Sequence, residues 1–193
     1  MDEHDRDRLY LLLLALMAEC QEEIRARTTQ LQNGIIAREL WTGEMLHLLA
    51  RYGGAALMLG VERDELTDAE QATLAAWLRG QAGYLADFAN EIAHAAAWEN
   101  YWNSRAEMYG DAVQVPYWMG YDHGVTLPAY PGDGSAECLT SDRCQWRLDW
   151  LDETRGDLNA YWVTEKDGKV CPTCQVRGER WFPLQVRGGV YHV

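Results

Sequence analysis

The sequence is poor in lysine and in positive charge overall. Lys166 and Lys169 are its only lysines, so nearly all of its 17 basic residues are arginine. The 30 acidic residues leave a formal net charge of −13. This balance excludes a protein whose whole surface binds DNA electrostatically. Only residues 169–193 are mildly basic, with four basic residues and one acidic residue.

The sequence also lacks a long apolar run. Residues 9–18 form the main one, and its ten residues are about half of what a bilayer span requires. The residues before it include Asp2, Glu3, Asp5 and Asp7, which is the wrong charge for a signal peptide. We therefore expect no membrane association and a helix that packs in a core or against a partner.

Catalytic signatures are missing as well. There is no His-Glu-x-x-His helix, no Gly-x-Ser-x-Gly elbow and no glycine-rich dinucleotide fingerprint. Residues 132–135, Gly-Asp-Gly-Ser, lack the lysine of a phosphate-binding loop and are interpreted as a turn before Cys138. We expect no enzymatic activity in this chain.

What the sequence does contain is an ordinary globular composition, with 48% hydrophobic and 24% charged residues. Good helix formers predict a helix over residues 5–32, ended by Asn33-Gly34. A second helix is expected over residues 36–52. The Gly53-Gly54 pair that follows is a hinge or a close helix contact.

A third helix is expected to begin after Thr67, which forms a capping box with Glu70. Apolar residues at three-, four- and seven-residue intervals then mark one helix face, which is predicted to continue to about Tyr109. Gly80 and Gly83 are its weak points. The residues of this face are Leu74, Leu78, Leu85, Phe88, Ile92 and Ala96.

The chain changes character where two prolines and two glycines fall within residues 126–135. This divides it into an α-helical docking domain, residues 1–125, and a small cysteine-rich β module, residues 126–193. Strands are predicted over residues 145–150 and 158–163, with turns near Arg155-Gly156 and Asp167-Gly168. The expected fold class is α+β: a helical bundle or long hairpin followed by a zinc-ribbon-like module.

Four of the five cysteines form two short pairs, Cys138-x5-Cys144 and Cys171-x2-Cys174, separated by 26 residues. This spacing is typical of a tetrahedral four-cysteine zinc site. A small β module buries too little apolar surface to be stable alone, and a bound metal ion would stabilise it. Four thiolates would fill the coordination shell, so the zinc is expected to be structural. Cys20 lies apart from these pairs and is expected to be a packed residue of the first helix.

Alternatives to this zinc site remain open. Cys171-Pro172-Thr173-Cys174 would suit a redox role, although the motif is expected to follow a turn in a small β region and not to lie at the strand-to-helix junction of a thioredoxin-like fold. The cysteines would otherwise be unpaired or joined in disulfides, although their odd number without a secretory signal argues against a disulfide framework and favours the cell interior. His123 or His192 would be able to replace one cysteine ligand.

Two weaker patterns point to partners. Arg177, Arg180 and Arg187 lie among aromatic residues, which suits nucleic-acid contact, or else residues 177–182 form a packed strand with a solvated edge. The apolar face of the first helix would be a docking surface for a protein partner. Its candidate residues are Leu9, Leu12, Leu13 and Leu16.

Residues 127–135, Cys138, Cys144-Gln145-Trp146 and residues 167–174 resemble the minor head proteins of tailed bacteriophages, the head-morphogenesis family. A looser resemblance covers residues 66–109. In better-known members a Cys-Pro-x-Cys pair comes first and a His-Pro-x-Cys-x-Cys element closes the module, whereas here the pair comes second and that element is absent.

The resemblance implies a virion component near the portal vertex, present in the host cytoplasm during assembly, with no catalytic residues. Its expected partners are the phage portal or other head proteins, or a second copy of the chain. A competing hypothesis is a zinc-ribbon-like regulator that binds nucleic acid, and a weak DNA contact through the basic tail belongs to both. A third hypothesis is a thiol oxidoreductase.

Overall fold

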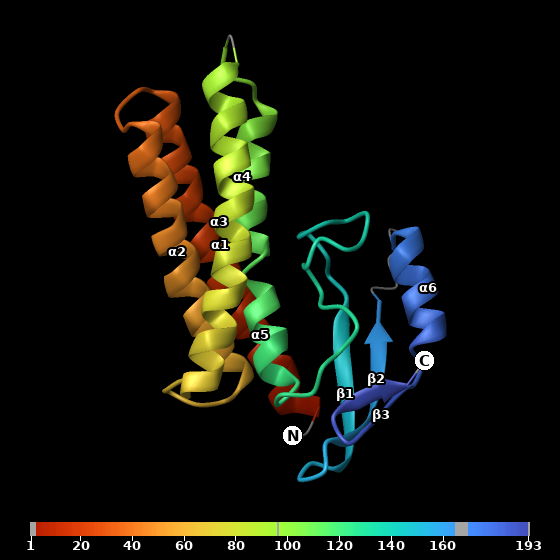
Figure 1. Cartoon of the computed structure of the whole chain (residues 1–193). Helices are drawn as coiled ribbons and strands as arrows, with labels where there is room; N and C mark the ends of the chain where they lie inside the picture. The colour runs from red at the N-terminus through yellow and green to blue at the C-terminus, as the bar shows by residue number, and fades with distance from the viewer. Residues whose placement is uncertain (1–2, 96, 165–169, 193) are drawn as a thin grey trace.

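The computed structural model describes residues 3–95, 97–164 and 170–192, as a bundle of helices followed by a small antiparallel sheet (Figure 1). The helices are α1 (Glu3–Gln32), α2 (Arg38–Gly60), α3 (Asp68–His94), α4 (Tyr101–Asp111), α5 (Gln114–Tyr121) and α6 (Pro172–Arg180). The strands are β1 (Gln145–Asp152), β2 (Asp157–Val163), β3 (Leu184–Arg187) and β4 (Val190–His192). The predicted fold class is confirmed.

The first two helices meet at the predicted turn. Gly34 has a φ of +68°, a left-handed conformation that glycine adopts without strain, and the chain reverses there into α2. α2 then continues past its predicted end at residue 52. A Cβ on Gly53 would lie 2.6 Å from Cζ3 of Trp77 in α3, so the glycine pair serves a close helix contact and not a hinge.

α3 begins as predicted. The Thr67 hydroxyl accepts the backbone N–H of Glu70 at 3.4 Å, and the Glu70 carboxylate accepts the Thr67 N–H at 2.8 Å. Gly80 and Gly83 do not interrupt the helix, and a Cβ on either would meet nothing within 4 Å.

The prediction that this helix continues to Tyr109 is wrong. α3 ends at His94, and α4 starts at Tyr101 as a separate helix. α4 folds back beside α3, where the Arg105 guanidinium lies 4.6 Å from the ring centre of Phe88. The reversal buries Trp102 and Ala106, which a straight helix would leave without a partner.

The residues of the β region form one four-stranded sheet in the order β1-β2-β3-β4, and every neighbouring pair is antiparallel. Trp146 and Trp162 are cross-strand partners with ring centres 5.1 Å apart, and both are buried. The two predicted strands are confirmed. β3 and β4 were not predicted, because they have only four and three residues, at or below the shortest run that indicates a strand in the sequence.

The prediction of a packed strand over residues 177–182 is wrong, since most of that segment belongs to α6. Pro172 occupies the first turn, where its fixed φ favours a helix and its missing N–H costs nothing. The predicted turn at Asp167-Gly168 lies outside the described residues.

A segment without regular structure, residues 122–144, connects α5 to β1 and contains the predicted domain boundary. It runs between the bundle and the sheet (Figure 1). Buried side chains from both parts form one hydrophobic cluster, so the division at residue 126 stays a prediction. Within the described ranges, no helix is long and apolar enough to cross a membrane.

Candidate metal centre

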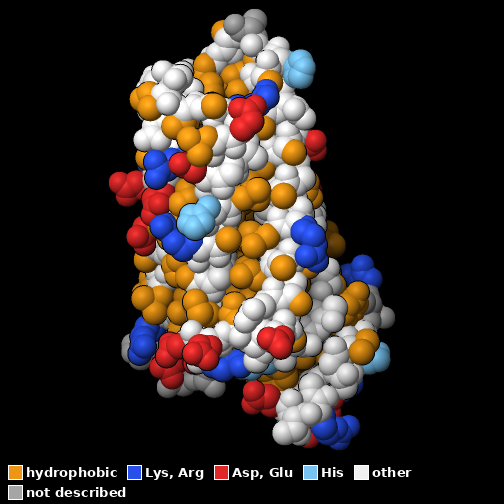
Figure 2. Space-filling view, turned by 60° about the vertical axis from the view of Figure 1, so that its left-hand side comes forward, with side chains coloured by type: hydrophobic (Ala, Val, Ile, Leu, Met, Phe, Trp, Pro, Cys, Tyr) orange, Lys and Arg blue, Asp and Glu red, His pale blue; other side chains and the backbone are white. Residues whose placement is uncertain are grey.

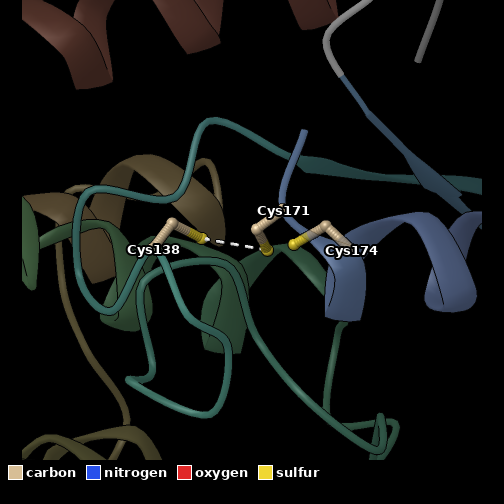
Figure 3. Close-up of side chains that lie close together, drawn as sticks. All are labelled: Cys138, Cys171 and Cys174. Atoms are coloured by element: carbon tan, nitrogen blue, oxygen red, sulfur yellow. Dashed lines mark hydrogen bonds between the residues drawn. The ribbon is translucent and has the colours of Figure 1, made fainter. Parts of the chain in front are cut away.

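Four cysteines from two parts of the chain, the connecting segment and the start of α6, converge at one place. Cys138 lies in a turn, Cys144 directly precedes β1, Cys171 is the N-cap of α6 and Cys174 lies in its first turn. All four are free thiols. Figure 3 shows the sulfur of Cys138 directed toward Cys171 and Cys174 across the gap between the two segments.

The sulfur atoms of Cys138, Cys171 and Cys174 form one group in which all three lie within 4.8 Å of one another. The sulfurs of Cys138 and Cys171 are 3.9 Å apart. In a tetrahedral site with metal–sulfur bonds of about 2.3 Å, two sulfurs are about 3.8 Å apart. This group can therefore hold a metal ion without large movement.

Cys144 belongs to a second group, which shares Cys174 and adds the carboxylate of Asp142. Oδ2 of Asp142 lies 3.6 Å from the sulfur of Cys174, and Oδ1 accepts the backbone N–H of Cys144 at 2.8 Å. All three residues are buried. The four predicted cysteines are thus brought together around Cys174, and Cys144 lies beside the first group without being part of it.

Asp142 was not identified from the sequence. The signal that would have found it is its position two residues before Cys144, the spacing at which an aspartate side chain accepts a backbone N–H in an Asx turn. Aspartate is also a common residue in turns, so this spacing alone does not distinguish a cluster residue from an ordinary turn residue.

Burial raises the pKa of three of the four thiols. It raises the pKa of Cys138 to about 12, with the negative charge of Asp142 as the next cause. The pKa values of Cys144 and Cys174 are raised for the same first reason, with Asp142 again contributing. Without a cation, burial therefore favours the protonated form of these three thiols, and a metal ion would supply the charge that stabilises thiolates.

The N-terminus of α6 is held by a residue from the connecting segment. Oε2 of Glu137 accepts the backbone N–H of Thr173 at 3.2 Å. Hydrogen bonding, first that of Thr173, lowers the pKa of Glu137 to about 2. This bond links the two segments that carry Cys138 and Cys171.

The alternatives to a four-cysteine site fare differently. Among the described residues, the groups that can hold a metal contain neither His123 nor His192. His123 instead lies 3.5 Å from the Glu153 carboxylate. The expectation that the Cys171–Cys174 motif does not lie at the start of a helix is wrong, because Cys171 is the N-cap residue of α6. The turn expected before the motif lies outside the described residues. Cys20 is buried in α1, as expected.

The candidate nucleic-acid residues make contacts within the chain. Arg177 donates to Ser135 Oγ at 2.8 Å, and its guanidinium lies 5.1 Å from the Trp162 ring centre. Arg187 donates to the backbone oxygen of Leu158 at 2.8 Å. Arg180 is exposed. Two of the three arginines thus support the fold of the β region.

The candidate docking leucines divide between core and surface. Leu13 is fully buried in the core of this chain, which corrects its assignment to a docking surface. Leu12 is 46% exposed, and Leu9 and Leu16 are half-buried. These last three line a groove between α1 and α2, which we call the α1–α2 groove; Ala55, Met58 and Leu59 form its other side. Figure 2 shows hydrophobic side chains reaching the surface along one face of the bundle.

Comparison with known proteins found no match: no protein family, no curated protein and no solved structure resembles the chain closely enough to count as one.

Proposed function

We propose that this chain is a structural assembly protein of the phage minor-head type, which acts by protein–protein contact and carries a structural zinc ion. The observation that carries the proposal is the cluster of Cys138, Cys171 and Cys174, which belongs to the segments that resemble the head-morphogenesis family. The proposal places the protein in the virion, and in the host cytoplasm during assembly.

Zinc suits this cluster better than other common ions. Thiolates are soft ligands that favour zinc over magnesium or calcium, and zinc prefers the tetrahedral arrangement that the sulfur spacing matches. A closed shell of protein ligands leaves no position for water or substrate, which supports a structural and not a catalytic role.

The zinc ion would connect the connecting segment to α6. The strands of the sheet have at most eight residues, so the β region has limited apolar area to hold the connecting segment and α6 together by itself. Structural zinc sites contribute on the order of 10–16 kcal/mol of apparent binding free energy.

The α1–α2 groove is the proposed docking surface for a portal protein. The Leu12→Asp variant places a charge in this groove at an exposed position, so we expect portal binding to weaken by at least about tenfold while folding is retained. The measurement is co-purification with the portal protein encoded in the same genome, followed by titration of the two purified proteins.

Leu40→Asp is the matched control, because Leu40 is 52% exposed on α2 and does not line the groove. It should bind the portal like the unaltered chain. Equal binding by both variants would exclude the groove as the docking surface. No portal binding by the unaltered chain would overturn the proposed function itself.

A further inference from the structure

The carboxylate of Asp142 lies against Cys174 of the three-cysteine cluster, and it is an additional candidate for the metal's fourth ligand. Cys138, Cys171 and Cys174 supply three sulfurs. Asp142 and Cys144 form a second group with Cys174, outside the group of three sulfurs. The identity of the fourth ligand therefore depends on which of these two residues fits better.

The distances fit an oxygen ligand. A tetrahedral zinc with bonds of about 2.3 Å to sulfur and about 2.0 Å to oxygen separates the two ligand atoms by about 3.5 Å. The distance from Asp142 Oδ2 to the Cys174 sulfur is 3.6 Å. The 3.9 Å between the sulfurs of Cys138 and Cys171 fits the opposite edge of such a tetrahedron. Asp142 belongs to the group of Cys144 and Cys174, so its carboxylate has to move toward the sulfurs of Cys138 and Cys171 to complete the site.

Charge supports the same choice. A metal-bound cysteine is a thiolate without a proton, so the sulfur of Cys174 would then face the Asp142 carboxylate with no hydrogen between them. Asp142 is only 4% exposed, and water does not screen this repulsion. A cation must lie between two such anions, and the metal ion bound by both satisfies this requirement.

The position of Cys144 does not require it to be ionised. Four thiolates and an unbound carboxylate around Zn²⁺ would bury a formal charge of about −3, against about −2 for three thiolates and the carboxylate. The second arrangement leaves Cys144 as a neutral thiol. The backbone N–H of Cys144 binds Oδ1 of Asp142, which holds the carboxylate with Oδ2 toward Cys174.

We propose that Asp142 is the fourth metal ligand, through Oδ2, and that Cys144 remains an uncoordinated thiol beside the site. This inference rests on the proposed zinc site and defines its ligand set. A carboxylate is a harder ligand than a thiolate. A site with three thiolates and one carboxylate should therefore favour soft ions such as Cd²⁺ less strongly than a four-thiolate site does.

X-ray absorption at the zinc edge of the unaltered, zinc-loaded chain tests the ligand set without any variant. We expect three sulfurs at about 2.3 Å and one oxygen at about 2.0 Å. A shell of four sulfurs with no oxygen would overturn the inference and leave the proposed zinc site standing. A chain that binds no zinc would overturn both.

Two variants provide an independent test. Asp142→Asn keeps an oxygen that accepts the Cys144 N–H but removes the anionic ligand, so zinc affinity should fall by more than the roughly 10–100-fold that the loss of an outer-shell partner costs. Cys144→Ser should change the affinity by less than about threefold. Affinities are measured by competition with a chromophoric chelator, with Cys138→Ser as the variant that must lose zinc. The reverse order of the two effects would overturn the inference.

Discussion

Asp122, the C-cap residue of α5, is a buried carboxylate that belongs to neither of the two metal-binding groups described above. It accepts hydrogen bonds from the Tyr130 hydroxyl at 2.5 Å and from the Gly124 N–H at 2.9 Å. Burial raises its pKa to about 7, because desolvation outweighs the two hydrogen bonds that lower it. The side chain ties the end of the helical bundle to the connecting segment.

This raised pKa predicts a pH-dependent stability. The folded chain keeps a proton on Asp122 between about pH 4 and pH 7 that the unfolded chain has lost, so the free energy of unfolding falls as pH rises through this window. Relative to Asp122→Asn, the loss should be on the order of 3 kcal/mol. Urea unfolding at pH 4.5 and 7.5 measures it, and equal pH dependence of both chains would contradict it.

At the scale of elements, α2 and α5 cross at two glycines. A Cβ on Gly60 would lie 2.2 Å from the backbone oxygen of Tyr117, and one on Gly120 would lie 2.7 Å from the backbone oxygen of Leu57. Neither neighbour is a flexible side chain that can turn aside. The two helices approach this closely because both positions lack a Cβ.

Gly60→Ala should therefore destabilise the chain by about 1–3 kcal/mol, since α5 must move away from α2. Gly43→Ala is the matched control in the same helix, because a Cβ there meets nothing within 4 Å. It should stabilise the chain by up to about 1 kcal/mol through helix propensity. Thermal unfolding compares the two, and a Gly60→Ala variant as stable as the original would refute the close contact.

The elements that were predictable are those with local signals. The capping box at Thr67, the turn at Gly34 and the alternation in β1 each depend on neighbouring residues alone. The break between α3 and α4 has no comparable signal, because a periodic apolar face continues through it. Only packing of α4 against α1 and α3 decides that the helix reverses.

At the scale of the whole molecule, the bundle and the sheet share one hydrophobic cluster, and polar contacts add to it. Ser141 donates to Asp111 at 2.6 Å, and Gln114 donates to the backbone oxygen of Thr140 at 2.9 Å. These bonds hold the segment that carries Cys138 and Cys144 against α4 and α5. A metal ion in the cluster would therefore add a link to α6 on one side of the connecting segment, which already contacts α4 and α5 on the other.

Metal analysis of a preparation never exposed to chelator should find about one zinc per chain. Removing it should lower the melting temperature by roughly 10 °C or more, because a bound ion stabilises only the folded state. The near-ultraviolet signal of buried tryptophans such as Trp146 should weaken more than the helical signal, since the cluster lies on the sheet side. Clearly less than one zinc per chain, or an unchanged melting temperature, would contradict the zinc site.

The sequence alone determined the fold class, both ends of α1, the starts of α2 and α3 and the four cysteines that converge, because these follow from composition, local caps and short spacings. The tertiary structure decided which groups meet. Leu13 is buried in the core, Arg177 and Arg187 donate hydrogen bonds to other residues of the chain, and Asp142 lies beside Cys174. Cys174 is 32 residues from Asp142 along the chain, and no local pattern encodes contacts at that separation.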